Sequence, residues 1–539
     1  MRRTVSLWRG IPLLIVIIAA AIAGMAWAVS SPIGSSPDED FHLASIWCPP
    51  PVETSGCKVQ TDAQGVTSVT LIARVVAAPA CYAFHPDTSG SCIWAVPADK
   101  LVSDSRFDRG EYPGGFYRVM HIFASNDPYA SVYAIRAFNL ALAICLGAAL
   151  VLAATRPTRR IIAYAVASTY VPMGMFIIPS ANPSSWAVMG LTATAFALHS
   201  YWLATTRPRL IANGVLAAVG VIMAVSARGD AALYVVLTAV AITVLHYRRV
   251  RGHALRAILP AVLAVVGGVV ARTSSQTTSA LSTGLGTGTA GGWRLLFSNL
   301  VNLPYVVLGN QGLGNLGWLD TPLPSLVSVG MIMVTSFLLM AGLSRLSWVK
   351  ALVAGGGVLV LMALPLFILQ VSHYFVGQGM QPRYLLPLLP VISLVVLTGY
   401  RPDQAVRLSP LFAWFSWGLV SAANSVALMV NIRRYTTGMD GPTWPGQLVE
   451  WWTPGAPGPM VTWIVGSLAF AVAAWMVVRL SSGPDPVAIT AELDQRSIEP
   501  TSATASGEVV AAEPTTGDDT AAEDVRSATP TEPTGIRPH

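Results

Sequence analysis

The sequence predicts an all-α polytopic membrane protein with about twelve transmembrane helices. Of its 539 residues, 53% are hydrophobic and only 11% are charged, whereas a soluble domain carries about 25% charged residues. The apolar residues fall in long runs, and a run of about 20 residues spans the hydrocarbon core of a bilayer. The net charge of +6 arises from arginines between these runs. We therefore expect a lipid bilayer, and no nucleic acid, as a partner.

Twelve apolar runs, separated by polar segments, support this prediction. They cover residues 11–29, 129–154, 161–178, 186–204, 210–227, 231–247, 257–271, 326–343, 351–371, 385–399, 410–430 and 460–478. Ala26-Trp27-Ala28 at the end of the first run resembles a signal-peptidase site. The length of this run favours a retained first transmembrane helix, residues 1–29, over a cleaved signal peptide.

The distribution of basic residues predicts the orientation of the chain. Arg156, Arg207 and Arg248 belong to arginine-rich loops that alternate with loops poor in basic residues. Because basic loops stay in the cytoplasm, we expect a multi-pass protein of the cell membrane with both termini cytoplasmic. Residues 481–539 are rich in Ser, Thr, Pro and acidic residues, and they predict a disordered cytoplasmic tail.

Two long polar segments interrupt the runs on the outer side. Residues 30–128 predict a folded extracytoplasmic loop domain, in which the alternation of Val66–Val76 is typical of a strand. Residues 129–480 form the predicted multispanning membrane domain, and residues 272–325 form its own outer loop.

Four of the five cysteines lie in the first polar segment, which predicts two extracytoplasmic disulfides. Their spacing favours the pairs Cys48–Cys57 and Cys81–Cys92 among the three pairings that four cysteines allow. A zinc site is less favoured, because the segment lacks a CxxC pair.

An acidic motif follows the first run directly. Asp38 and Glu39 are predicted as catalytic carboxylates, because ionisable groups at a membrane boundary are costly and tend to mark function. Being adjacent, they point to opposite sides of an extended segment. A helix that begins at Pro37 would place His42 on the same face as Asp38. The alternative is an ordinary helix start, with Ser36 as the N-cap and Glu39 in a capping box.

Predicted substrate-binding residues lie on the same side of the membrane. Arg383 stands where an outer loop re-enters the membrane, and its guanidinium could bind a lipid-borne phosphate bidentately. Arg228 is either a second phosphate contact or the partner of Asp230 in an ion pair. An arginine at position 383 could also extend to lipid headgroups.

Several short motifs resemble an uncharacterised bacterial family of predicted multispanning membrane proteins of unknown function. That family typically shows PPDE-x-x-H early, H-P-P-x-Y-Y in the first loop and G-R-Y-x-L-P late. The matching segments are Pro37–His42, Tyr112–Tyr117, Asn182-Pro183 and Gln381–Pro387, with Ser184 and Pro382 departing from the pattern. The family is similar in layout to the GT-C class of lipid-dependent glycosyltransferases, in which the first outer loop carries an acidic catalytic residue. The resemblance implies a GT-C-like fold and adds Gln381, Tyr384 and Tyr112 to the expected substrate-binding residues.

Together, topology and resemblance predict an integral membrane glycosyltransferase. It would transfer a sugar from a polyprenyl-phosphate donor to a glycan or lipid acceptor of the cell envelope on the outer face. Asp38 or Glu39 would act as general base, Arg383 with Arg228 would hold the donor phosphate, and His42 would orient the base or help to bind phosphate or a metal. No cofactor is required, although a divalent cation (Mg²⁺ or Mn²⁺) could assist.

Two other functions fit the predicted topology. A transporter or lipid flippase would place its site near the bilayer midplane, but the predicted spans are poor in mid-helix charge. A non-catalytic assembly partner would be indicated if Asp38, Glu39 and Arg383 lay far apart.

Overall fold

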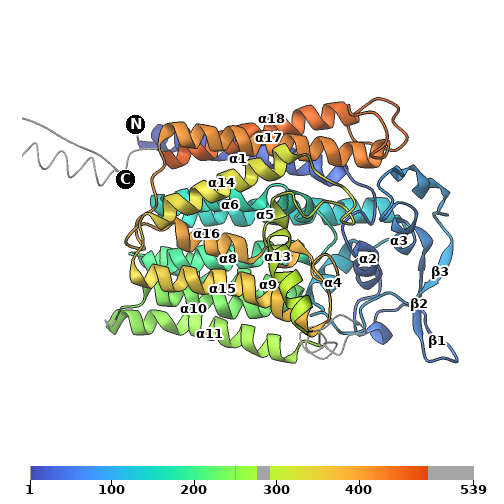
Figure 1. The fold of residues 1–539 in the computed structure, drawn as a ribbon, viewed down its shortest axis with the longest axis horizontal. Helices are drawn as coiled ribbons and strands as arrows, with labels where there is room; N and C mark the ends of the chain where they lie inside the picture. The colour runs from blue at the N-terminus through green and yellow to red at the C-terminus, as the bar shows by residue number, and fades with distance from the viewer. Residues whose placement is uncertain (1, 249–250, 276–291, 483–539) are drawn as a thin grey trace, which may run out of the picture. The chain divides into compact units, whose positions relative to one another are not determined.

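The protein is a bundle of long helices with a set of short elements gathered at one end. The structure, a computed structural model, describes residues 2–248, 251–275 and 292–482. Within these ranges nine helices are long and apolar enough to cross a membrane. The long helices run in roughly the same direction, and the short elements lie at the right in Figure 1. The predicted all-α polytopic class and the multi-pass membrane location are confirmed.

Each of the twelve predicted runs folds as a helix. These helices are α1 (Arg2–Val29), α5 (Pro128–Ala153), α6 (Arg156–Tyr170), α8 (Ser184–Leu203), α9 (Arg207–Ala227), α10 (Gly229–His246), α11 (Arg251–Thr273), α14 (Ser325–Leu343), α15 (Trp348–Val371), α16 (Leu388–Leu397), α17 (Pro410–Thr436) and α18 (Pro459–Ser482). Helices α6, α8 and α16 are shorter or less apolar than the other nine. The run 161–178 is also divided, because Pro172 separates α6 from the short α7 (Met173–Ile177).

Helix α8 is less apolar because protein, rather than lipid, surrounds it. Nearly all of its residues are buried, including Thr194 and His199. It packs closely on α9, where a Cβ atom on Gly190 or on Gly220 would lie 2.6 Å from the carbonyl oxygen of the other glycine. Only glycine permits this approach, as in other close contacts between membrane helices.

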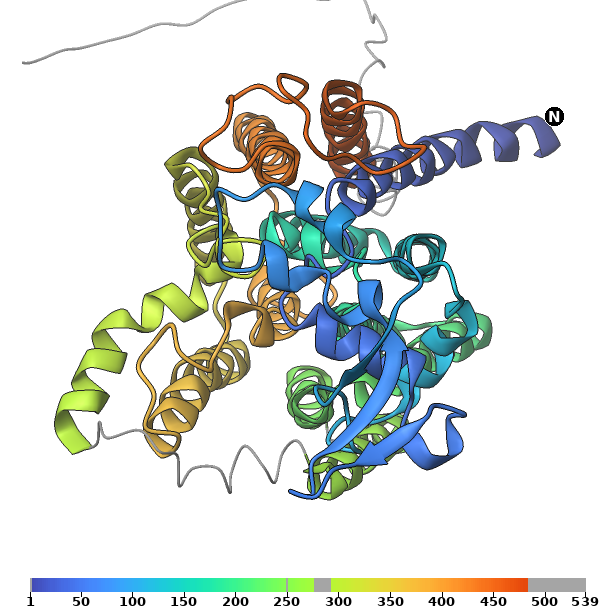
Figure 2. The ribbon, with the colours of Figure 1, turned by 90° about the vertical axis from the view of Figure 1, so that its right-hand side faces the viewer.

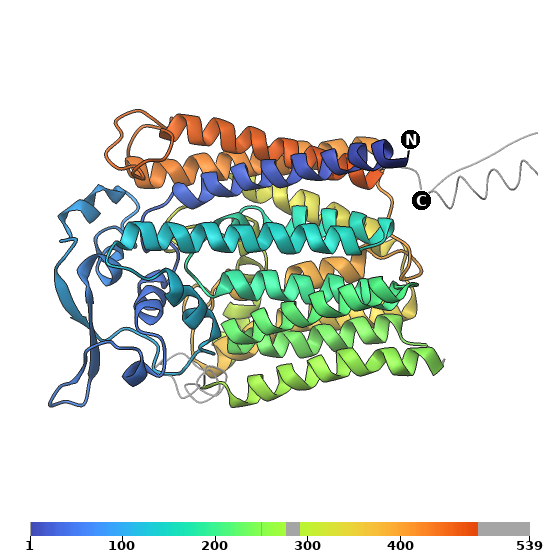
Figure 3. The ribbon, with the colours of Figure 1, turned by 180° about the vertical axis from the view of Figure 1, so that it is seen from behind.

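Helices from the two ends of the described chain pack together. Helix α1 packs on α18, which packs on α17, and the start of α1 and the end of α18 are at the same end of the bundle (Figures 1 and 3). The Trp27 indole N–H of α1 donates to Asn424 Oδ1 of α17 at 3.1 Å. This arrangement agrees with an even number of membrane crossings.

The short elements at the other end belong to residues 30–127, which we call the loop domain. Its helices are α2 (Glu39–Trp47), α3 (Ala73–Val76) and α4 (Gly115–Met120), and its strands are β1 (Val59–Thr61), β2 (Thr67–Ile72) and β3 (Leu101–Asp104). The strands form an antiparallel sheet in the order β1-β2-β3. Strand β2 falls within the predicted strand region. Its Val69 and Leu71 point to a small core with Phe107. Figure 2 views the bundle from this end.

The second polar segment contains a helix that the sequence analysis did not predict. Helix α13 (Gly292–Val307) buries Leu295, Asn299 and Leu303, spaced four residues apart, and exposes apolar side chains such as Trp293 on its other side. It is followed by the turn η6 (Gly309–Gln311). Such an amphipathic helix lacks the continuous apolar run by which a span is recognised. The predicted tail, residues 481–539, lies outside the described residues beyond Ser482.

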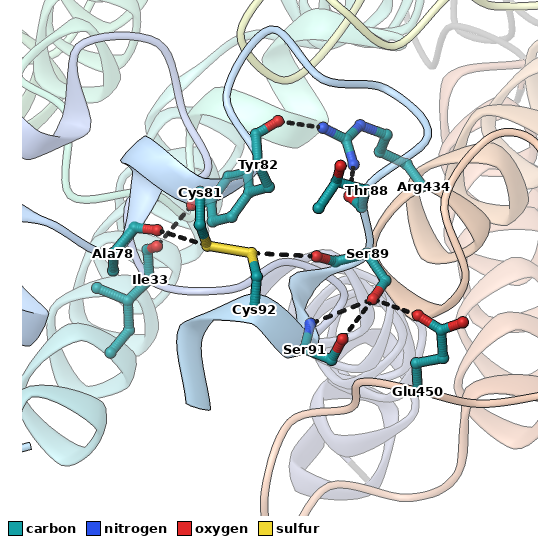
Figure 4. The surroundings of a disulfide bond; sticks show 10 residues. All are labelled: Ile33, Ala78, Cys81, Tyr82, Thr88, Ser89, Ser91, Cys92, Arg434 and Glu450. Atoms are coloured by element: carbon teal, nitrogen blue, oxygen red, sulfur yellow. Dashed lines mark hydrogen bonds between the residues drawn. A yellow bond between two sulfur atoms is a disulfide. The ribbon is translucent and has the colours of Figure 1, made fainter. Parts of the chain in front are cut away.

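Both predicted disulfides are present. Cys48 pairs with Cys57 and Cys81 pairs with Cys92, with Cα–Cα distances of 5.9 and 6.0 Å. Figure 4 shows how the second disulfide lies among contacts that join the loop domain to the membrane helices. Arg434 of α17 donates to the carbonyl oxygens of Tyr82 (2.7 Å) and Thr88 (2.6 Å). Ser89 Oγ donates to Glu450 Oε2 at 2.6 Å.

The disulfide pattern predicts the outcome of thiol labelling. The denatured, unreduced protein should react with one maleimide, because Cys145 is the free cysteine of the described residues. After reduction all five cysteines should react. Mass spectrometry of the labelled chain checks both values. Labelling of three or more thiols before reduction would contradict the pairing.

Candidate functional site

The chain between α1 and α2 is buried and held by side chains from distant parts of the sequence. Arg136 of α5 donates to the carbonyl oxygens of Ala28 (2.9 Å), Ser31 (2.6 Å) and Pro32 (2.6 Å). Trp318 donates its indole N–H to the carbonyl oxygen of Gly34 at 2.9 Å. These bonds satisfy backbone acceptors that burial would otherwise leave unpaired. The acidic motif is therefore placed by the membrane bundle and not by the loop domain alone.

Two of the predicted motifs meet directly at Pro37 and Asp38. Arg383, in the turn η7 (Pro382–Tyr384), donates from Nη2 to Asp38 Oδ2 at 2.6 Å and from Nη1 to the carbonyl oxygen of Pro37 at 2.9 Å. Asn182 Nδ2 donates to the same carbonyl oxygen, also at 2.9 Å. Three segments that resemble the family motifs thus converge on one point, although 345 residues separate Asp38 from Arg383.

A second arginine contacts Asp38. Arg106, which follows β3, donates from Nη2 to Asp38 Oδ1 at 2.7 Å and forms an ion pair with Asp40. The Arg383 side chain is 2% exposed, whereas those of Asp38 and Arg106 are 31% and 47% exposed. Asp38 therefore lies between a fixed, buried guanidinium and a solvent-facing one.

Asp38 also has an unusual backbone conformation. Its φ of 60° and ψ of 17° lie in the left-handed region, where aspartate is tolerated better than most residues. Helix α2 begins directly after it, at Glu39. The capping box is half formed, because Glu39 Oε2 accepts from the Ser36 backbone N–H at 2.9 Å, while Ser36 Oγ has no partner among the described residues.

The electrostatic surroundings keep Asp38 ionised. Burial alone would raise the pKa of its carboxyl group, but the charge of Arg383, the hydrogen bond from Arg383 and the charge of Arg106 hold that pKa below its ordinary value. At the neighbouring Asp40 the effect of burial is larger than that of the charges. Burial raises the pKa of Asp40 despite its ion pair with Arg106.

Glu39 points away from Asp38, as expected for adjacent residues. It is fully buried. Its Oε1 accepts from the Ala181 backbone N–H at 2.9 Å, and its Oε2 lies 3.6 Å from Arg136 Nη2. Both oxygens are engaged in holding the segment in place, so Asp38 is the carboxylate that faces solvent.

His42 lies in a buried aromatic cluster beside the Asp38–Arg383 pair. Its Nδ1 forms a hydrogen bond with the Tyr117 hydroxyl at 2.9 Å, and its ring is 5.5 Å from that of Tyr112. Burial, together with the charges of Arg383, Arg228 and Arg106, lowers the pKa of His42 well below its ordinary value, and Asp38 opposes this only in part. His42 is neutral at neutral pH, and its Nε2 is buried without a partner among the described residues.

The ring of Tyr384 lies against two of the predicted arginines. The guanidinium of Arg228 lies 4.6 Å from the ring centre and that of Arg383 lies 5.2 Å from it. Arg228 forms the ion pair considered in the sequence analysis, with two hydrogen bonds of 2.9 and 2.8 Å to Asp230. Gln381 Oε1 is buried with no partner in the described part of the chain. The two guanidinium groups therefore pack on one aromatic ring beside Asp38, and each is paired with a carboxylate.

No group of three or more His, Cys, Asp and Glu side chains within the described ranges is arranged to hold a metal ion. The carboxylate of Asp38 is already shared by two arginines. The site as it stands can bind an anion through guanidinium groups and can accept a proton on a carboxylate. Whether Mg²⁺ or Mn²⁺ assists stays a prediction.

Arg106 and Arg136 were not among the predicted site residues. Arg136 carried a usable signal, because an arginine inside an apolar run must find buried partners. No feature of the sequence distinguishes Arg106, because it lies among several charged residues of a polar segment.

A buried aspartate next to the cluster predicts a pH effect on stability. Asp108 accepts three backbone N–H groups through Oδ1, but burial still raises its pKa to about 6. The folded state binds this proton more tightly than the unfolded chain, so the stabilisation is full at low pH and is lost as the pH rises through 6. We expect thermal unfolding to show a loss of about 1 kcal/mol between pH 5 and pH 7.5 that Asp108→Asn removes. Equal pH dependence in both proteins would contradict this assignment.

Comparison with known proteins supports the motif analysis. A family model described as a predicted membrane protein (DUF2142) matches residues 21–392, which is more than half of the chain and includes all the converging segments. Searches of curated proteins and of solved structures each return no match. The predicted resemblance to a family of multispanning membrane proteins is thereby confirmed. The chain belongs to the DUF2142 family of predicted membrane proteins.

Proposed function

We propose that the protein is an integral membrane glycosyltransferase that uses a polyprenyl-phosphate-linked sugar. The observation that carries this proposal is the contact between Asp38 and Arg383 at the loop-domain end of the bundle. A carboxylate that can accept a proton and a buried cation that can hold phosphate are the two groups that sugar transfer from a phosphate requires.

The proposed orientation places this site on the outer face of the cell membrane. Both disulfides lie in the loop domain, and disulfides persist outside the cytoplasm. Arginine-rich turns, such as those at Arg156 and Arg207, lie at the opposite end and fit a cytoplasmic location. Nucleotide sugars are cytoplasmic, so an outer site calls for a donor carried by a membrane lipid.

In the proposed reaction the donor phosphate binds Arg383. The acceptor hydroxyl attacks the anomeric carbon of the sugar while its proton passes to Asp38. The bond between that carbon and the phosphate oxygen breaks, and polyprenyl phosphate leaves with the electron pair. The acceptor, a glycan or lipid of the cell envelope, gains the sugar.

Phosphate binding would also activate the base. Asp38 has a low pKa because Arg383 and Arg106 neutralise it, and such a weakly basic carboxylate takes up a proton poorly. A phosphate that draws either guanidinium away would raise the pKa of Asp38 toward its ordinary value. In the absence of donor, Asp38 is therefore a weak base, because the arginines that would bind the donor phosphate are paired with it.

The other predicted residues have positioning roles in this proposal. Arg228, which Asp230 neutralises, supports the ring of Tyr384 and thereby the adjacent Arg383. His42 Nε2 and Gln381 Oε1 are buried and unpartnered among the described residues, and they offer hydrogen bonds to the sugar or the phosphate. Tyr112 packs against His42.

The test is transfer by purified protein in liposomes that contain a radiolabelled polyprenyl-phosphate sugar and a membrane extract as acceptor. We expect label to move from the polyprenyl lipid to the extract, and Arg383→Gln to abolish that movement. Arg401→Gln, in an exposed turn at the other end of the bundle, is the matched control. If the labelled lipid only changes leaflet without losing its sugar, the protein is a flippase and the proposal fails.

A further inference from the structure

A polar groove on the loop domain lies next to the candidate site. It has a volume of about 350 Å³ and is lined by residues that include Glu53, Thr67, Phe107, Arg109 and Arg118. Ligand sites in proteins usually measure about 300–1,000 Å³. The groove is therefore large enough for one or two sugar rings.

The two arginines of the groove are anchored but not neutralised. Arg118 Nη2 donates to the carbonyl oxygen of Pro50 at 3.2 Å. Arg109 Nη2 donates to the carbonyl oxygens of Thr67 (2.9 Å) and Ser105 (3.2 Å). Neither arginine forms an ion pair with a described residue, in contrast to Arg106, Arg228 and Arg383. The anchored guanidinium groups keep further N–H donors and a full positive charge for an anion.

The rest of the lining suits a sugar. Glu53 and Thr67 can exchange hydrogen bonds with hydroxyl groups, while Pro51 and Tyr112 offer apolar surface to the C–H face of a ring. Glu53 is the carboxylate of the lining, so two positive charges face one negative charge. The groove thus favours a ligand with both hydroxyl groups and a negative charge.

Tyr112 connects the groove to the candidate site. Its ring lines the groove, yet it also lies 5.5 Å from the ring of His42 and 5.8 Å from the guanidinium carbon of Arg228. Tyr112 therefore contacts both a ligand in the groove and two residues of the candidate site.

We propose that the groove is a binding site for an anionic sugar of the acceptor, one that carries a carboxylate or a phosphate. Arg109 and Arg118 bind the negative charge, and Tyr112 is the lining residue that also contacts His42 and Arg228 of the candidate site. As an acceptor site the inference rests on the proposed glycosyltransferase function. As a site for anionic glycans it depends only on the groove.

The experiment measures binding of fluorescent trigalacturonate to the full-length protein in nanodiscs, with neutral maltotriose for comparison. We expect trigalacturonate to bind at least about 10-fold more tightly than maltotriose, since its carboxylates can accept charge-assisted hydrogen bonds from the two arginines. Arg109→Gln/Arg118→Gln should weaken trigalacturonate binding by about 10- to 100-fold. Lys58→Gln/Lys100→Gln removes the same charge from exposed positions of the loop domain and should leave binding unchanged.

Each other outcome overturns the inference. Equal binding of both trisaccharides would exclude recognition of charge. Equal losses of trigalacturonate affinity in the two double variants would show that binding depends on the net charge of the loop domain and not on the groove. No binding by the wild-type protein would exclude the site. Asp38→Asn should bind trigalacturonate normally, because Asp38 does not line the groove. If the wild-type protein binds trigalacturonate but transfers no sugar, the proposed function is overturned and this site is not.

Discussion

Asp38→Asn is expected to reduce sugar transfer by about 100- to 10,000-fold, the usual contribution of a general base. The loss should fall on the rate of transfer and not on folding. Asparagine keeps one amide oxygen that can accept the hydrogen bond from the buried Arg383, and it tolerates the left-handed conformation that residue 38 adopts. Transfer by the reconstituted protein is the measurement.

The control for this substitution is Asp99→Asn, which changes an exposed carboxylate of the same loop domain. It should transfer sugar at the wild-type rate. Near-normal transfer by Asp38→Asn would remove Asp38 from the role of base. Glu39→Gln should instead lower stability, because both oxygens of Glu39 are engaged in the buried segment.

Arg136→Met is expected to lower the free energy of unfolding by about 3–5 kcal/mol, the typical effect of removing one partner from a buried ion pair. The substitution leaves Glu39 without its cation and frees the carbonyl oxygens of Ala28, Ser31 and Pro32 from their donor. The segment that carries Asp38 would lose its attachment to α5. Thermal unfolding in nanodiscs measures the effect.

A double-variant cycle separates the charge from the hydrogen bonds. Adding Glu39→Gln to Arg136→Met removes the unpaired carboxylate and should recover part of the lost stability. Arg401→Met, at an exposed turn, should change stability by less than about 0.5 kcal/mol. If Arg136→Met were as stable as Arg401→Met, the buried segment would not depend on this arginine.

The helices were predictable because lipid imposes a simple rule on the chain. A long apolar run must form a helix wherever it meets hydrocarbon, and all twelve runs do so. Helix α8 shows the limit of the rule, since a helix enclosed by protein can carry Thr194 and His199. Helix α13 was not predicted because it is amphipathic. Only one of its sides is buried, so its sequence has no continuous apolar run.

The site was predictable where residue chemistry and topology acted together. Charged residues such as Asp38 and Arg383 stood out beside apolar runs, and an alternating topology placed both on one side. Their direct contact links positions 345 residues apart, and only the packing of the bundle brings these positions together. The same holds for Arg106, whose role comes from a loop position after β3 that no local pattern distinguishes.

In the proposed function, Arg383 binds the phosphate of a lipid-linked donor beside Asp38. The most direct measurement is photolabelling of the reconstituted protein by a polyprenyl phosphate with a photoreactive group near the phosphate, followed by peptide mapping. We expect labelling of peptides around residues 37–42 and 381–387, with loss of both labels in Arg383→Gln and retention in Arg401→Gln. Labelling that is confined to the lipid-facing sides of the helices, or that is unaffected by Arg383→Gln, would contradict it.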